Sequence, residues 1–104
     1  MDRLSQLKQY VFEEPDDPFN QYALALEYLK TDPTEAGRLF ESLIQRQPQY
    51  LPTYYPYAHW LIERKNYDRA ELIFQRGIET ARTRKDHKTL KELQAAYTDW
   101  KYEQ

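Results

Sequence analysis

The sequence predicts an all-α fold of about six antiparallel helices. Apolar residues recur at the spacing of a helix, and Asp-Pro pairs stand where helices would begin. The chain of 104 residues contains only 2 Gly, too few for a sheet of tight hairpins. There is no cysteine, which excludes a disulfide framework and a thiolate metal site. We therefore expect a single helical domain over residues 1–104.

An Asp precedes each of the first three predicted helices, and in two cases the residue after it is Pro. This order is typical of a helix start, because the Asp side chain caps a free amide and Pro lacks an amide that would need a partner. We place these helices over about residues 3–13, 18–30 and 33–47, capped by Asp2, Asp17 and Asp32. Glu35 stands three residues after Asp32, so we expect its carboxylate to bond the Asp32 amide in a capping box.

Three more helices follow from the apolar pattern of the second half. They cover about residues 54–65, a stretch from Asn66 or Asp68 to near Lys85, and a stretch from about Asp86 onward. Pro56 lies inside the first of them, where an interior Pro would cost about 3 kcal/mol. If Thr53 is the cap, Pro56 falls in the first turn, where amides have no helical partner.

Two segments of the chain repeat with small and large apolar residues in the same order. At an offset of 34 residues, Ala36, Leu39, Phe40 and Ile44 align with Ala70, Ile73, Phe74 and Ile78. In the preceding helices, Leu24, Ala25 and Tyr28 align with Tyr57, Ala58 and Leu61. Alanines allow two helices to cross closely, and the phenylalanines fill the space that opens further along. A repeated helical hairpin is therefore predicted.

This pattern resembles the tetratricopeptide repeat, a helix-turn-helix unit of about 34 residues. The resemblance, to small single-domain proteins of bacterial type, implies an antiparallel helix-hairpin solenoid. It divides the chain into an N-terminal half-repeat helix, a first repeat, a second repeat and a C-terminal capping helix, over residues 1–15, 18–48, 51–84 and 86–104. The sequence departs from the pattern at Arg82, where a closing Pro is expected, and at Gln21 and Tyr54, where the family has Trp.

The resemblance also implies a function and a site. In such solenoids the first helix of each repeat lines a concave face that binds a peptide or a partner protein. Here that face would be a Tyr-rich groove of Phe19, Tyr22, Leu26, Leu29, Tyr55, His59 and Ile62. The same side chains also fit a core buried against neighbouring helices. Because few charges are among them, binding is predicted to depend only modestly on salt. The implied function is that of a non-catalytic interaction module or scaffold.

A second interpretation is a structural or assembly element that associates with itself through its end helices, which makes a homo-oligomer possible.

Two charged stretches are weighed as further sites. The basic run at Arg82, Arg84, Lys85, Lys88 and Lys91 is interpreted as a solvated helix end, with docking of an acidic partner as the alternative. The acidic turn at residues 13–17 is interpreted as solvated, because Pro15 interrupts the spacing of a cation site.

The composition argues against other classes of function. A net charge of -2 and a pI near 5.7 give no concentrated basic face, so no nucleic-acid partner is expected. The mean hydropathy is -1.00 and no apolar run approaches the roughly 20 residues of a membrane helix, so we expect no membrane partner and a cytoplasmic protein. No phosphate-binding glycine loop and no paired nucleophile and base are present, so we expect no catalytic residue, no metal site and no cofactor.

Overall fold

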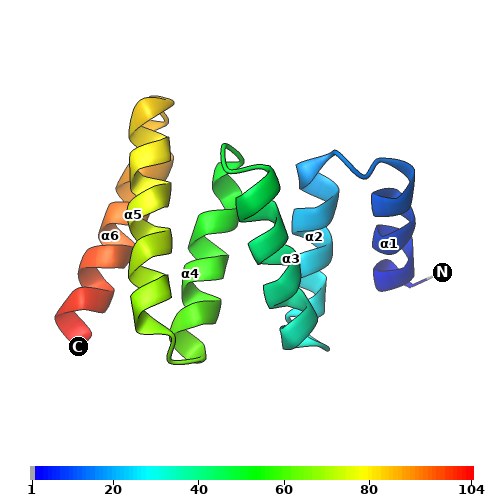
Figure 1. Ribbon diagram of the computed structural model, residues 1–104, viewed down its shortest axis with the longest axis horizontal. Coiled ribbons are helices and arrows are strands. Elements are labelled where there is room, and N and C mark those ends of the chain that lie inside the picture. The colour runs from blue at the N-terminus through cyan, green and yellow to red at the C-terminus, as the bar shows by residue number, and fades with distance from the viewer. Residues whose placement is uncertain (1) are drawn as a thin grey trace. The chain divides into compact units, whose positions relative to one another are not determined.

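The computed structural model describes residues 2–104, and over that range it contains six α-helices, one short 3-10 helix and no strand (Figure 1). The elements are α1 (Arg3–Glu13), α2 (Pro18–Tyr28), α3 (Pro33–Arg46), η1 (Leu51–Thr53), α4 (Tyr54–Glu63), α5 (Tyr67–Thr83) and α6 (His87–Glu103). The all-α prediction is confirmed. Two helices are shorter than predicted, since α2 ends at Tyr28 and α4 at Glu63.

Five of the helices begin at a side-chain cap. In each case a side-chain oxygen accepts a hydrogen bond from the backbone amide of a residue two or three positions later. This bond satisfies one of the free amide donors of the first turn. The capping residues are Asp2, Asp17, Asp32, Asn66 and Asp86. The caps predicted from the Asp residues are confirmed. Of the two candidates for the start of α5, the structure selects Asn66, whose Oδ1 lies 3.4 Å from the amide nitrogen of Arg69.

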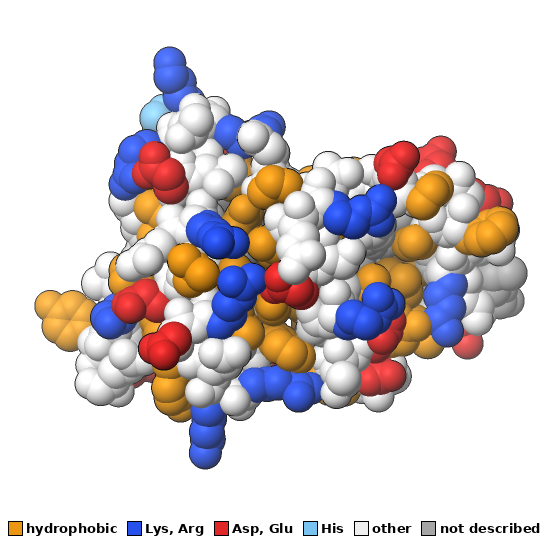
Figure 2. Space-filling view, viewed as in Figure 1, with side chains coloured by type: hydrophobic (Ala, Val, Ile, Leu, Met, Phe, Trp, Pro, Cys, Tyr) orange, Lys and Arg blue, Asp and Glu red, His pale blue; other side chains and the backbone are white. Residues whose placement is uncertain are grey.

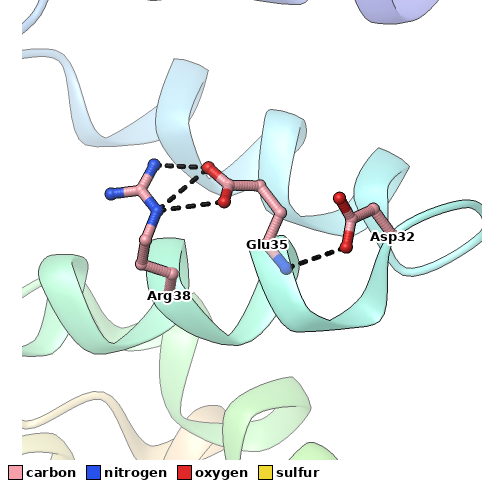
Figure 3. Close-up of polar contacts among 3 residues, drawn as sticks. All are labelled: Asp32, Glu35 and Arg38. Atoms are coloured by element: carbon pink, nitrogen blue, oxygen red, sulfur yellow. Dashed lines mark hydrogen bonds and ion pairs between the residues drawn. The ribbon is translucent and has the colours of Figure 1, made fainter.

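The capping box predicted at the start of α3 does not form (Figure 3). The amide of Glu35 donates to Asp32 Oδ1 at 3.3 Å, as a cap requires. The carboxylate of Glu35, however, faces Arg38, whose Nε donates to both of its oxygens at 3.0 Å. The Asp32 amide donates to the carbonyl of Tyr28 at 2.7 Å, so it has no need of the Glu35 side chain. The hydrogen bonds between Arg38 and Glu35 lower the pKa of Glu35 and raise the pKa of Arg38.

The start of α4 also differs from the prediction. Thr53 does not cap the helix, because its buried Oγ1 has no hydrogen-bond partner among the described residues. Instead, Thr53 is the last residue of η1, which runs directly into α4 and already gives the backbone a helical course. Pro56 is then the third residue of α4, in the turn where a missing amide breaks no helical hydrogen bond.

The helices pack as two compact units, which are described separately. One ends at Thr53 and the other begins at Tyr54. In the first unit, α2 packs against both α1 and α3 (Figure 1). Ala25 and Ala36 are fully buried, as expected where two helices cross closely, and Phe40 is buried beside them. From α1, Leu7 joins this core. That residues 1–104 form a single domain, made of a half-repeat, two repeats and a capping helix, stays a prediction.

In the second unit, α5 packs against both α4 and α6. Ala58, Ala70 and Phe74 are fully buried, so they repeat the arrangement of the first unit. The ring centroid of Phe74 lies 5.6 Å from that of Tyr97 and 5.8 Å from that of Trp100, both on α6. The C-terminal helix α6 therefore docks on α5 through an aromatic cluster.

Polar contacts add to the docking of α6. The Tyr97 hydroxyl and Lys101 Nζ both donate to Glu71 Oε2 on α5, each at 2.8 Å. These bonds lower the pKa of Glu71, with Lys101 as the larger cause, and raise the pKa of Lys101. Gly77, also on α5, is buried where Tyr54 of α4 approaches the helix most closely.

Helices α4 and α5 end with the same backbone conformation. Lys65 and Lys85 have φ of 62° and 60°, in the left-handed region that usually favours glycine. After each of them the next amide reaches back to close the helix, Asn66 to the Leu61 carbonyl at 2.9 Å and Asp86 to the Ala81 carbonyl at 3.0 Å. The residue that ends one helix in this way then caps the next, which produces the tight turns between the helices.

Candidate partner-binding site

Four of the seven residues predicted to line a groove belong to the first unit. Phe19 on α2 is 60% exposed, and Leu29, directly after α2, is 37% exposed. Tyr22 and Leu26 are half-buried. Exposed and half-buried apolar side chains therefore follow one side of α2, and the buried Leu24 lies on the opposite side.

Tyr22 is partly covered by Tyr50, a residue that the sequence analysis did not single out. The two ring centroids lie 5.8 Å apart with the rings tilted by 65°, an edge-to-face contact. Burial raises the pKa of Tyr22; it also raises the pKa of Tyr50, with smaller contributions from Tyr22 and Asp17. Both phenols therefore remain neutral near pH 7 and can offer a hydrogen bond, but they are poor acid-base groups.

The other three predicted residues belong to α4 in the second unit. Tyr55 is 48% exposed, and its ring lies 4.5 Å from that of His59. The His59 ring also meets Phe74 edge-on at 6.2 Å, and its Nε2 is buried with no hydrogen-bond partner among the described residues. His59 and Ile62 are half-buried. Of the three, Tyr55 is the exposed one, and the His59 ring packs toward the core of the second unit.

The space beside Tyr55 and Ile62 is bounded by α6, and we call it the α4–α6 groove. It contains one cavity of about 420 Å³ lined by Tyr55, Glu92, Ala95, Ala96 and Asp99. A second cavity of about 500 Å³ is lined by Ile62, Tyr67, Trp100, Glu103 and Gln104. Both volumes lie in the range of small-ligand and side-chain pockets. Within the second unit, Tyr55 and Ile62 therefore face an open, two-walled groove, whereas His59 lines neither cavity.

Comparison with known proteins identifies the family. The family model for the tetratricopeptide repeat matches residues 27–96. The chain belongs to the tetratricopeptide repeat family. The predicted resemblance is thus confirmed, and proteins of this family generally serve in protein–protein interaction and generally have no catalytic activity.

Solved tetratricopeptide repeat structures support the same assignment. The chain is similar to a tetratricopeptide repeat domain protein from Salinibacter ruber solved in solution by NMR, with 40% identity and a TM-score of 0.78. That alignment covers 83% of this chain and 88% of the other. A crystal structure of a tetratricopeptide repeat domain protein from the same organism aligns with 40% identity and a TM-score of 0.75, over 80% and 93% of the two chains. The comparison with curated proteins gave no match.

The α6 side of the groove was missed by the sequence analysis. Glu92, Ala96, Asp99 and Glu103 recur at the spacing of one helical face, and the small Ala95 and Ala96 leave room between the acids. That periodicity was visible in the sequence, but α6 was assigned only the role of a cap, as is common at the end of a tetratricopeptide repeat array. The expectation that few charges line the groove is wrong for the α4–α6 groove, because three carboxyl groups border its cavities.

Three further features of this tetratricopeptide repeat chain concern metal binding, membrane-spanning helices and surface charge. Within residues 2–104, no three His, Asp or Glu side chains gather in a way that would hold a metal ion. No helix in the same range is long and apolar enough to span a membrane. On the face that Figure 2 shows, basic, acidic and apolar side chains are interspersed.

Proposed function

We propose that this chain is a protein-interaction module that holds a segment of a partner protein in the α4–α6 groove. The observation that carries the proposal is the pair of cavities between Tyr55 and Ile62 on one helix and α6 on the other. The first unit has an apolar surface of its own on the exposed side of α2, with Phe19, Tyr22, Leu26 and Leu29. The Tyr-rich groove predicted from the sequence thus enters the proposal through both helices.

The side chains of the groove suit this role. Tyr55 is half exposed, and its phenol combines a large apolar ring with a hydroxyl that can form a hydrogen bond, as is common at the centre of interfaces. Its ring packs at a tilt against His59, which in turn contacts the buried Phe74, so a partner finds an anchor that is already held in place. A site that is ordered before binding loses less conformational entropy when the partner arrives.

The proposal is tested by selecting peptides from a displayed library on the full chain and measuring their Kd by calorimetry. Tyr55→Ala removes the exposed ring, and we expect the Kd to rise at least about tenfold, the effect of a typical anchor residue. Tyr10→Ala is the matched control, because Tyr10 is 42% exposed and lies outside both cavities. Equal affinities of the wild type and Tyr55→Ala would contradict the proposal.

Self-association through the end helices is the second candidate function. It is favoured by Phe12 on α1, which is 81% exposed, and by Tyr102 on α6. A large apolar ring in water is a common anchor of protein interfaces. Sedimentation equilibrium of the wild type, Phe12→Ser and Tyr102→Ser tests this candidate. It requires an oligomer that at least one substitution dissociates, and a wild type that stays monomeric at all concentrations contradicts it.

A further inference from the structure

The α6 wall of the groove carries a stripe of negative charge. Glu92 and Asp99 border the cavity beside Tyr55, and Glu103 borders the cavity beside Ile62. Seven and four residues separate the three acids, so at 1.5 Å per residue they stand about 10 Å and about 6 Å apart along α6. Both cavities thus pair an apolar side chain of α4 with at least one carboxylate of α6.

These carboxylates have no cationic partner within the described part of the chain, residues 2–104. Other acids of the second unit are paired, such as Glu71 with Lys101 at 2.8 Å and Glu79 with Arg82 at 2.7 Å. Lys88 precedes Glu92 by one turn on the same face of α6, so the stripe begins with one positive charge and continues with three negative ones. The lining of the two cavities therefore contains three acidic side chains and no Lys or Arg.

We propose that the segment bound in the α4–α6 groove is a cationic one, in which Lys or Arg alternates with large apolar residues. This inference rests on the proposed function and names the chemistry of its partner. Three unpaired carboxylates attract cations and repel anions. Arg and Lys side chains on the partner would supply the ion pairs that the chain itself does not provide.

The two walls explain the alternation. In an extended chain successive side chains point to opposite sides, and side chains on one side repeat about every 6.6 Å. That repeat is close to the separation of about 6 Å between Asp99 and Glu103. An extended segment lying beside Asp99 and Glu103 would therefore direct its cations to these two acids and its apolar side chains to α4.

The test compares two peptides of about eight residues, a length that spans about 26 Å when extended and so covers the stripe. One alternates Lys with Leu and the other alternates Glu with Leu, and calorimetry on the full chain gives the two Kd values. We expect the Lys–Leu peptide to bind at least about tenfold tighter. Raising the salt from about 0.1 M to about 1 M shortens the screening length from about 10 Å to about 3 Å and should remove most of that difference.

The variant Glu92→Gln/Asp99→Asn/Glu103→Gln neutralises the stripe with side chains of the same shape. We expect it to lose the preference for Lys–Leu over Glu–Leu. The control Glu13→Gln/Glu14→Gln/Glu79→Gln removes the same total charge at exposed positions outside the groove and should keep the preference. Circular dichroism confirms that both variants are folded.

Three results would overturn the inference: equal binding of the two peptides by the wild type, tighter binding of Glu–Leu, or no measurable binding of Lys–Leu. Tighter binding of Glu–Leu would point to the basic run at residues 82–91 instead. Loss of affinity in Tyr55→Ala is measured separately with the peptides selected from the library. If that loss is seen while Lys–Leu shows no preference, the groove still binds a partner and only the charge of that partner was inferred wrongly.

Discussion

Gly77→Ala tests whether close packing or helix propensity governs the middle of α5. By propensity alone, Ala in place of an interior helical Gly stabilises a protein by about 1 kcal/mol. The structure predicts the opposite sign. A Cβ at position 77 would lie 2.8 Å from Tyr54 Cβ, 2.9 Å from Tyr54 Cγ and 3.0 Å from Leu93 Cδ1. Favourable carbon contacts lie at about 3.5–4.0 Å, so all three would be too short.

The magnitude follows from these opposing effects. Tyr54 meets the added methyl with the base of its side chain, which cannot swing away without moving α4 relative to α5. Overpacking of this kind costs about 1–3 kcal/mol, and after the propensity gain of about 1 kcal/mol we expect a net loss of up to about 2 kcal/mol.

Urea titration of the full chain measures the change in the free energy of unfolding. Arg76 is the matched control, because it is exposed in the same helix one residue earlier, and Arg76→Ala should be more stable than Arg76→Gly by about 1 kcal/mol. A Gly77→Ala protein more stable than the wild type would refute the packing argument.

Three further predictions concern the same unit. Phe74→Ala should lower the free energy of unfolding by about 3–5 kcal/mol in urea, because a fully buried ring is replaced by a cavity; a loss below about 1 kcal/mol would contradict the aromatic cluster. Glu71→Gln should destabilise the protein at neutral pH but not in acid: since pairing lowers the pKa of Glu71 from its ordinary 4.5, its stabilisation is complete above that pH and is lost as the pH falls through the lower folded-state value. A difference between the two proteins that does not change with pH in thermal melts would refute this. Lys85→Gly should stabilise by about 0.5–1 kcal/mol because φ is 60° there, whereas Arg84→Gly, at φ of -81°, should destabilise; the reverse order would show that Lys85 is not strained.

The repeat and the helix starts were predictable because their causes are local. A cap depends on residues two or three positions apart, so Asp17 and Asp32 mark their helices in any fold that contains them. The repeat period also places the buried alanines in pairs, Ala25 with Ala36 and Ala58 with Ala70, because the same pattern occurs twice in the sequence. Local competition also explains one error, since Glu35 had two possible partners and its spacing from Arg38 suits a helical ion pair.

The site was predictable only in part because it depends on which helices become neighbours. The apolar side of α4 follows from its own periodicity, so Tyr55 and Ile62 were identified. The opposite side of the groove is formed by α6, about 40 residues later in the chain. The residue spacing within α4 does not indicate which helix will lie opposite it. Tyr50 was missed for the same reason, because its contact with Tyr22 arises from the turn that follows α3.

The central claim is that the partner lies in the α4–α6 groove, and amide NMR of the full chain titrated with the tightest library-selected peptide tests it most directly. The account predicts that the largest shift changes occur at Tyr55, Ile62, Ala95 and Ala96, which line the two cavities. Shift changes confined to α1, around the exposed Phe12, with those four amides unmoved, would contradict it.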